Sequence, residues 1–307
     1  MGFVNKRTGL LWGFVIMLCA GALLVRVSSA AAAEREPWEL AKSIQDSLFS
    51  AQSALLIEDD SATAQDLVAQ AAEAAEALDK LPQESQALLQ TALDQAAVAV
   101  ANNDQIGLAG ARGLAKSAIN WGSYQVTRQS VMEGDTDAAR QWLLVREFRP
   151  STRFSRPDAD ATLALRHLAE GSTTVEEALA QVDADLLNTY QARMAEYMTT
   201  AVDSNELATR RAESAGVATA YWQMLVPAYS DQYGQSAADT LTADINNLLP
   251  AVMTGDWQAA GRITPTLGHT RRIPCCTIVS RKIRHDGRVN WFVPLPGTIK
   301  YERWRRG

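Results

Sequence analysis

Cysteine and histidine are scarce in this chain of 307 residues, which contains three of each. Cys19 lies in an apolar N-terminal run, and the other two cysteines, Cys275 and Cys276, are adjacent. Neighbouring cysteines close at best a strained ring, so we expect no disulfide to staple the body of the fold. His167 is the single histidine between residues 34 and 260, and we interpret it as a packing or surface residue. The chain therefore lacks the Cys/His spacing of a metal site.

Other functional signatures are missing as well. We find no glycine-rich phosphate loop, no nucleophile elbow and no paired acid and base in a plausible setting, so the sequence predicts no enzyme. No apolar run after residue 25 is long enough to span a membrane. No strand pattern is convincing before residue 270. These absences leave a helical body held together by apolar burial.

The N-terminal segment has the three parts of an export signal. Lys6 and Arg7 precede the apolar run Leu10–Val25, and the small residues Ala31–Ala33 come directly before Glu34. This arrangement predicts a signal peptide at residues 1–33 and an exported, periplasmic or extracytoplasmic mature chain. The alternative is an uncleaved segment that associates the protein with the inner membrane.

Charge divides the remainder of the chain into two compositions. Residues 1–260 contain 18 Lys/Arg and 33 Asp/Glu, whereas residues 261–307 contain eleven and two. The basic segment 261–307 has no helical period, and we interpret it either as a disordered tail or as out-of-frame translation that truncates the gene product. Basic tails can bind nucleic acid. An exported protein is separated from the nucleic acid of the cell, so we expect no nucleic-acid partner.

Helical periodicity covers the body, residues 34–260. Leu40, Ile44, Leu48, Ala51 and Leu55, for example, recur at steps of three or four and would line one helix face. We expect helices at about 38–57, 61–81, 84–101, 105–132, 134–148, 157–171, 174–202, 205–229 and 236–252. The fold class predicted is all-α, with antiparallel helical hairpins forming one or two bundles, and a division into two sub-bundles would fall near 150–157.

Several turns share one local pattern. EDDSATAQ, EGDTDAAR and TGDWQAAG, which begin at residues 58, 133 and 254, each place an aspartate before alanines. We predict short hairpin turns in which the aspartate caps the next helix. Thr174 and Glu177 form a capping-box pattern. Pro227 is expected to end or kink its helix.

The stretch VREFRPSTRFSRPDADATLAL, residues 145–165, concentrates positive charge in an acidic body. Its arginines, which we call the arginine corner, are Arg146, Arg149, Arg153 and Arg156. One interpretation is a site where guanidinium groups contact an anion or an acidic partner. The other is a structural corner whose arginines pair with neighbouring carboxylates.

Two prolines shape this corner. Pro150 would stop one helix, and Pro157 would begin the next. Asp158 and Asp160 would then face the positive end of that helix.

The motif REFRP-x-TRFSRP-x-ADATLAL, together with DADLLNTYQARMAE (183–196) and AYWQMLVPAYSDQYG (220–234), resembles the extracytoplasmic N-terminal region of bacterial FTR1-family iron permeases. The resemblance covers roughly residues 34–260. The Arg-Glu-x-x-Glu motifs that the family carries in membrane helices are absent, because the literal match REPWE at 35–39 lies in polar sequence and contains Pro37. A frameshift or early stop near residue 262 would explain the missing membrane domain.

The resemblance implies a role in iron uptake, in which the module captures iron or delivers it to a membrane permease. The partners implied are a membrane iron permease domain or other iron-uptake components. Iron, as Fe2+ or Fe3+, would be the metal, and the candidate carboxylates are Glu147, Asp158 and Asp160. The alternative function is a non-catalytic periplasmic interaction or sensor bundle that binds no metal.

Overall fold

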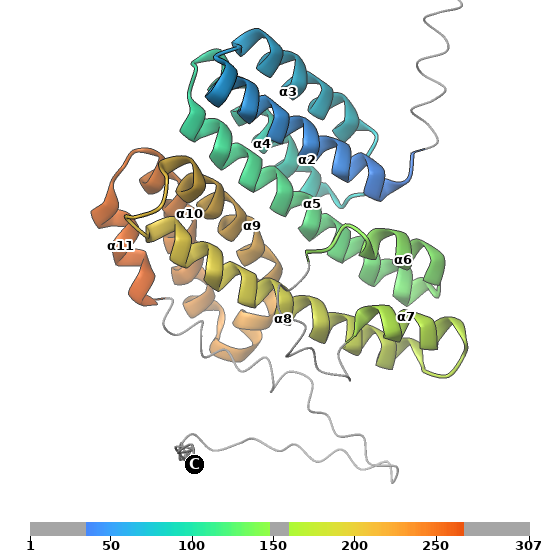
Figure 1. The fold of residues 1–307 in the computed structure, drawn as a ribbon. Helices are drawn as coiled ribbons and strands as arrows, with labels where there is room; N and C mark the ends of the chain where they lie inside the picture. Colours follow the sequence, from blue (N-terminus) through green and yellow to red (C-terminus); the bar gives the residue numbers. More distant parts are fainter. Residues whose placement is uncertain (1–34, 148–159, 267–307) are drawn as a thin grey trace, which may run out of the picture. The chain divides into compact units, whose positions relative to one another are not determined.

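The structure, a computed structural model, describes residues 35–147 and 160–266 (Figure 1). These residues contain helices and no strand, which confirms the all-α prediction. The predicted signal segment 1–33, the proposed division near 150–157 and the chain beyond residue 266 lie outside the described residues. The helices are α2 (Pro37–Ser53), the π-helical turn η1 (Ala54–Glu58), α3 (Ser61–Glu76), α4 (Gln83–Ala101), α5 (Gln105–Glu133), α6 (Thr136–Leu143), α7 (Ala161–Ala169), α8 (Val175–Val202), α9 (Ala208–Tyr233), α10 (Gln235–Met253) and α11 (Trp257–Thr266).

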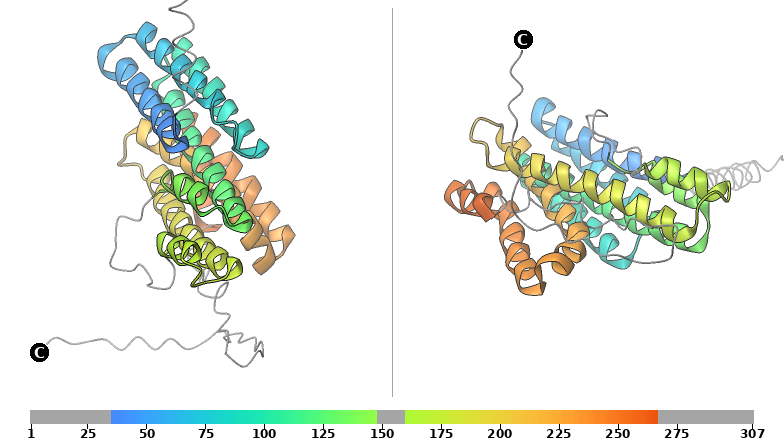
Figure 2. Two further views of the ribbon diagram at one scale, coloured as in Figure 1. Left: turned by 90° about the vertical axis from the view of Figure 1, so that its right-hand side faces the viewer. Right: turned by 90° about the horizontal axis from the view of Figure 1, so that it is seen from below.

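Helix α5 is the central element of the described fold. It packs against α4 and α2 on one side, and against α9 and α8 on the other. Successive helices form antiparallel hairpins, for example α2 with α3 and α8 with α9. Figures 1 and 2 show these two hairpins along α5. The short helices α6 and α7 lie beside each other and pack against α5 and α8, respectively.

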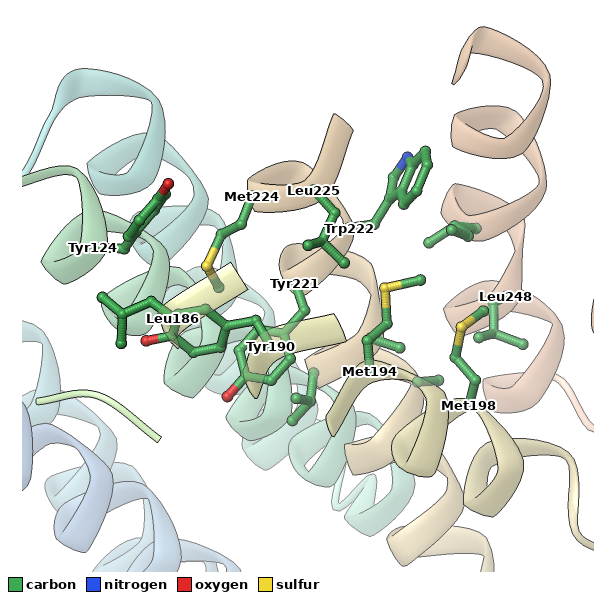
Figure 3. Close-up of a cluster of buried hydrophobic side chains, with 14 of the residues drawn as sticks. Tyr124, Leu186, Tyr190, Met194, Met198, Tyr221, Trp222, Met224, Leu225 and Leu248 are labelled. Atoms are coloured by element: carbon green, nitrogen blue, oxygen red, sulfur yellow. The ribbon is translucent and has the colours of Figure 1, made fainter. Parts of the chain in front are cut away.

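Buried apolar side chains form two clusters that meet at α5. One cluster combines residues of α2, α3, α4 and α5, among them Ile44, Leu48, Leu93 and Ile119. The other combines α5 with α6 to α11 and contains most of the buried aromatic and methionine side chains; Figure 3 shows part of it. Its labelled members are Tyr124, Leu186, Tyr190, Met194, Met198, Tyr221, Trp222, Met224, Leu225 and Leu248. The body is thus held by apolar burial, as expected in the absence of disulfides.

Glycines let α5 and α9 approach closely. A Cβ atom added at Gly113 would clash with the carbonyl oxygen of Glu213, and one added at Gly216 would clash with the carbonyl oxygen of Gly110. Ser117, one turn further along α5, donates its hydroxyl to the Gly113 carbonyl at 2.8 Å. Such a close approach requires a residue without a Cβ atom at the point of contact on at least one of the two helices.

The predicted helix caps are confirmed. Asp60, Asp135 and Asp256 accept hydrogen bonds from backbone N–H groups three residues ahead, at 2.9, 3.0 and 2.9 Å. Thr174 and Glu177 form the predicted capping box at the start of α8. These contacts link residues close in sequence, so the local pattern suffices to identify them.

Some helix boundaries differ from the prediction. Helix α6 ends at Leu143, before residue 148, and the next residues turn. Helix α7 begins at Ala161 instead of Pro157, because Asp160 has an extended backbone and caps the helix. Helix α9 continues through Pro227 to Tyr233.

Candidate functional site

Arg146 and Glu147 lie three and four residues beyond the end of α6 at Leu143. The chain leaves the helix through turns in which the backbone N–H of Val145 donates to Trp142, at 3.1 Å, and that of Arg146 donates to Leu143, at 3.4 Å. Arg146 and Glu147 are therefore placed by the end of α6, and their side chains contact different neighbours. Arg149, Arg153, Arg156 and Asp158 lie outside the described residues.

Glu147 is the centre of a buried polar network, which we call the Glu147 network. Its Oε1 accepts hydrogen bonds from Tyr197 Oη at 2.8 Å, from Arg193 Nε at 2.9 Å and from Arg193 Nη2 at 2.7 Å. Its Oε2 accepts a hydrogen bond from the hydroxyl of Tyr221. Lys116 Nζ lies 3.5 Å from Oε1 and donates to Tyr197 Oη at 3.2 Å. One carboxylate thus joins α5, α8 and α9.

Positive charge compensates the burial of this carboxylate. The Glu147 side chain is 8% exposed, and that of Arg193 is 19% exposed. Burial by itself would raise the pKa of Glu147, but Lys116 and the hydrogen bonds from Tyr221, Arg193 and Tyr197 outweigh it and lower the pKa below its ordinary value. Glu147 is therefore ionised at neutral pH, with acceptor positions on both oxygens occupied by protein donors.

Tyrosines surround the network on its apolar side. The ring of Tyr221 lies 5.0 Å from that of Tyr190 and 6.1 Å from that of Tyr197, centroid to centroid. Burial, followed by the nearby Glu147 charge, raises the pKa of Tyr221 well above its ordinary value. The Tyr221 hydroxyl accepts a hydrogen bond from Asn120 Nδ2 at 2.8 Å and donates its own proton to Glu147. Tyr190 and Tyr221 stand together in Figure 3.

The partners of Glu147 were not identified from the sequence. Tyr190, Arg193 and Tyr197 lie at steps of three and four on α8, a spacing that puts them on one helix face. That spacing was the available signal; Tyr190 and Arg193 lie within the DADLLNTYQARMAE segment that carries the family resemblance, and Tyr197 follows it directly. The spacing alone does not reveal that the face meets a glutamate 46 residues earlier in the chain.

Arg146 lies beside a pocket between α6 and α7. Its Nη2 donates to Thr162 Oγ1 at 2.9 Å, which ties the end of α6 to the first turn of α7. The pocket, with a volume of about 370 Å³, is lined by Arg140, Gln141, Leu143, Leu144, Arg146, Thr162 and Arg166. Arg140 and Arg166 were not singled out from the sequence, because they stand in separate helices on either side of the arginine corner.

Asp160, a candidate metal ligand in the sequence, is the N-cap of α7. Its Oδ1 accepts the backbone N–H of Leu163 at 3.1 Å. Within residues 35–147 and 160–266, no three His, Cys, Asp or Glu side chains are grouped so that they could hold one metal ion. The expectation that Glu147, Asp158 and Asp160 bind iron stays a prediction.

A family model for the iron permease FTR1 N-terminal domain matches residues 33–266. The match spans every described helix and well over half of the chain. The chain belongs to this family. In this chain the resemblance segments supply Glu147, Arg193 and Tyr221 of the Glu147 network. Comparison with curated proteins and with solved structures gives no match.

FTR1 proteins are iron permeases, a family of transporters, and membership is consistent with a part in iron uptake. Among the helices of residues 35–147 and 160–266, none combines the length and the apolar character needed to cross a membrane.

Proposed function

We propose that this chain is the extracytoplasmic helical module of an FTR1-type iron-uptake system and that it assists iron capture or iron delivery to a membrane permease. The match to the FTR1 N-terminal domain over residues 33–266 is the observation that carries the proposal. The predicted signal peptide at 1–33 supports an exported, periplasmic location. Its partners in this proposal are a membrane iron permease domain or other iron-uptake components.

The surface charge of the N-terminal helices supports a role with cations. Residues 35–104 contain thirteen Asp and Glu but three Lys and Arg, and twelve of these acidic residues are exposed. A surface of one sign raises the local concentration of counter-ions and speeds their arrival. Such a surface would enrich iron cations near the module.

Titration of the full chain with Fe2+ under anaerobic conditions tests the metal role. We expect saturable heat in calorimetry and a defined stoichiometry, since carboxylate oxygens are suitable ligands for iron cations. The absence of both heat and stoichiometric binding would remove metal capture from the proposal. Cell fractionation tests the location, because a cytoplasmic product would contradict export.

The second candidate is an interaction or sensor module that binds no metal. The environment of Glu147 favours it, because protein donors occupy that carboxylate. In this case the arginine corner would dock an acidic partner. The double substitution R149A/R153A separates the functions: loss of association with the permease without loss of folding indicates an interface, whereas collapse of the fold indicates a structural corner.

A further inference from the structure

The pocket between α6 and α7 brings three guanidinium groups together in an acidic body. Arg140 comes from the last turn of α6, Arg146 follows α6, and Arg166 lies in the last turn of α7. Residues 34–260 hold 15 Lys and Arg against 33 Asp and Glu, so three arginines around one cavity depart sharply from the surrounding composition. An anion bound at this cavity would be attracted by guanidinium groups from both helices.

Among the described residues, those that line the pocket include no carboxylate; Asp185 lies close by, since it accepts the backbone N–H of Ala161, the residue before Thr162, at 3.0 Å. Asp137, which is 89% exposed, lies 3.5 Å from Arg140. Exposed pairs of this kind contribute little stability. Within the described residues Arg166 forms no ion pair.

The shape and lining of the pocket indicate the class of anion. A volume of about 370 Å³ falls in the range of small-molecule sites. Guanidinium groups match the two oxygens of a carboxylate, and Thr162 and Gln141 add neutral polar groups. Leu143 and Leu144 supply an apolar wall, which a carbon skeleton can contact and an inorganic anion cannot use.

The Glu147 network holds one side of this pocket in place. Because Glu147 is bound to α8 and α9, the backbone of the adjacent Arg146 is fixed, and the guanidinium of Arg146 is further held by Thr162 at 2.9 Å. Side chains that are positioned before the ligand arrives lose less conformational entropy on binding.

We propose that the pocket of Arg140, Arg146 and Arg166 binds a small polycarboxylate anion and, through it, iron presented as a ferric polycarboxylate complex. The anion-binding part stands on the pocket alone, whereas the iron part rests on the proposed function in iron uptake. Ferric iron hydrolyses in neutral water unless anionic oxygen ligands hold it, and a polycarboxylate complex keeps a negative charge. A cationic pocket would therefore recognise the chelate and not the bare cation.

Calorimetric titration of the full chain with citrate, without iron, tests the anion site. We expect saturable binding near one to one that weakens by roughly tenfold in R166Q and in R140Q, since each loses a charge-assisted hydrogen bond. R210Q is the matched control, because Arg210 is an exposed helical arginine that pairs with Glu206 at 3.4 Å outside the pocket. Absence of citrate binding, or equal affinity in the wild type and R166Q, would overturn the proposal.

Inorganic phosphate and ferric citrate show which class of anion the pocket prefers and whether the anion can carry iron. Inorganic phosphate should bind at least tenfold more weakly than citrate, because it cannot use the apolar wall; equal binding would mean a general anion site and overturn the polycarboxylate class. Ferric citrate should compete with citrate and respond in the same way to R166Q. Failure of ferric citrate to compete would overturn the iron part. These titrations contain no free Fe2+, so their failure is distinct from failure of the Fe2+ titration.

Melting curves of R166Q and R140Q show whether a loss of citrate affinity comes from the pocket or from unfolding of the variant. Both side chains are exposed at the residue level, so we expect melting temperatures close to that of the wild type. R166K retains the positive charge but loses the bidentate fork, and citrate affinity between the wild type and R166Q is the expected result. Citrate affinity in R166K below that in R166Q would contradict recognition by charge.

Discussion

Glu147 carries a buried negative charge at the point where α5, α8 and α9 meet. Arg193, Lys116, Tyr197 and Tyr221 converge on its two oxygens. A buried ion pair gives little net stability over an apolar pair of the same shape, but removing one partner leaves the other charge uncompensated. The network therefore acts chiefly to fix which helix faces meet and where the chain enters residues 148–159.

Replacement of Glu147 by glutamine should destabilise the fold strongly. In E147Q the partly buried Arg193 and Lys116 lose their counter-charge, so we expect the free energy of unfolding to fall by about 3 kcal/mol, measured by urea denaturation. E196Q is the matched control, because Glu196 pairs with the same Arg193 but is 58% exposed, and its loss should change stability by less than about 1 kcal/mol. Equal effects of the two substitutions would refute a special role for the buried carboxylate.

The same residue predicts a loss of stability in acid. The pKa of Glu147 is lowered in the folded protein from its ordinary value of 4.5, so its contribution is present above about pH 4.5. That contribution declines as the pH falls from there through the folded pKa, because the unfolded chain takes up the proton first. The difference in stability between wild type and E147Q should therefore shrink below pH 4.5, as pH-dependent urea denaturation would show. A difference that stayed constant down to pH 3 would contradict this assignment.

Asp160 offers a test that separates a cap from a metal ligand. Asparagine caps a helix about as well as aspartate, whereas alanine does not. D160N should therefore keep the stability of the wild type, and D160A should lose about 1 kcal/mol in denaturant unfolding. If Asp160 also ligates iron, D160N will weaken the Fe2+ affinity without changing stability; unchanged affinity in D160N would remove it from the metal candidates.

At the scale of elements, the contact between α5 and α9 depends on glycine. The first half of α5 contains Gly107, Gly110 and Gly113, although glycine lowers helix propensity. In the structure Gly110, Gly113 and Gly216 lie where the two helices touch. The loss in propensity is offset by close packing, which brings α9 near enough for Tyr221 to reach Glu147.

Substitution of Gly113 by alanine should separate these helices. The added Cβ meets the backbone of Glu213, which cannot rotate away, so we expect a destabilisation of about 1–3 kcal/mol. G261A in α11 is the control, because a Cβ there meets nothing within 4 Å, and alanine should be neutral or stabilise that helix by up to about 1 kcal/mol. Thermal unfolding followed by circular dichroism compares the two. A neutral G113A would show that α9 can shift freely.

Helix α9 continues through Pro227 because aromatic packing on both sides of the proline outweighs the tendency of proline to end a helix. Proline lacks the N–H group of a helix interior and favours a helix end. Tyr229, two residues later, packs edge-on against Trp222 at 5.2 Å, and Tyr233 lies 4.7 Å from Tyr229. These ring contacts link the two sides of the proline, so the helix reaches Tyr233.

At the scale of the whole molecule, acidic charge and the arginine pocket occupy different regions. Residues 35–104 carry most of their acidic side chains on the surface, whereas Arg140, Arg146 and Arg166 gather between α6 and α7. Diffuse attraction of cations and specific binding of an anion can therefore coexist in the module. Both involve exposed charges, which salt screens, so they are distinguished by the sign of the ion and by the residues that it contacts.

A paramagnetic cation measures the diffuse attraction. At low ionic strength, Mn2+ should broaden NMR signals of residues 35–104 more than those of α8 and α9, and about 0.15 M salt should largely remove the effect, since the screening length is then about 8 Å. Broadening that persists in salt and centres on a few residues would indicate a built cation site instead.

How much of this protein follows from its sequence depends on the distance between interacting residues. The all-α class, the hairpins and the caps at Asp60, Asp135 and Thr174 follow from contacts within about four residues. The amino-acid pattern determines such contacts because helix geometry brings those positions together whatever the rest of the chain does.

Tertiary structure alone decided the partners of Glu147 and the lining of the arginine pocket. Arg193, Tyr197 and Tyr221 lie 46, 50 and 74 residues beyond Glu147 in sequence, and Arg140 and Arg166 stand in different helices. Their meeting depends on how α5, α8 and α9 pack, which the glycine contacts and the aromatic core set together. A single sequence states which side chains exist, whereas helix packing decides which of them share a charge or a cavity.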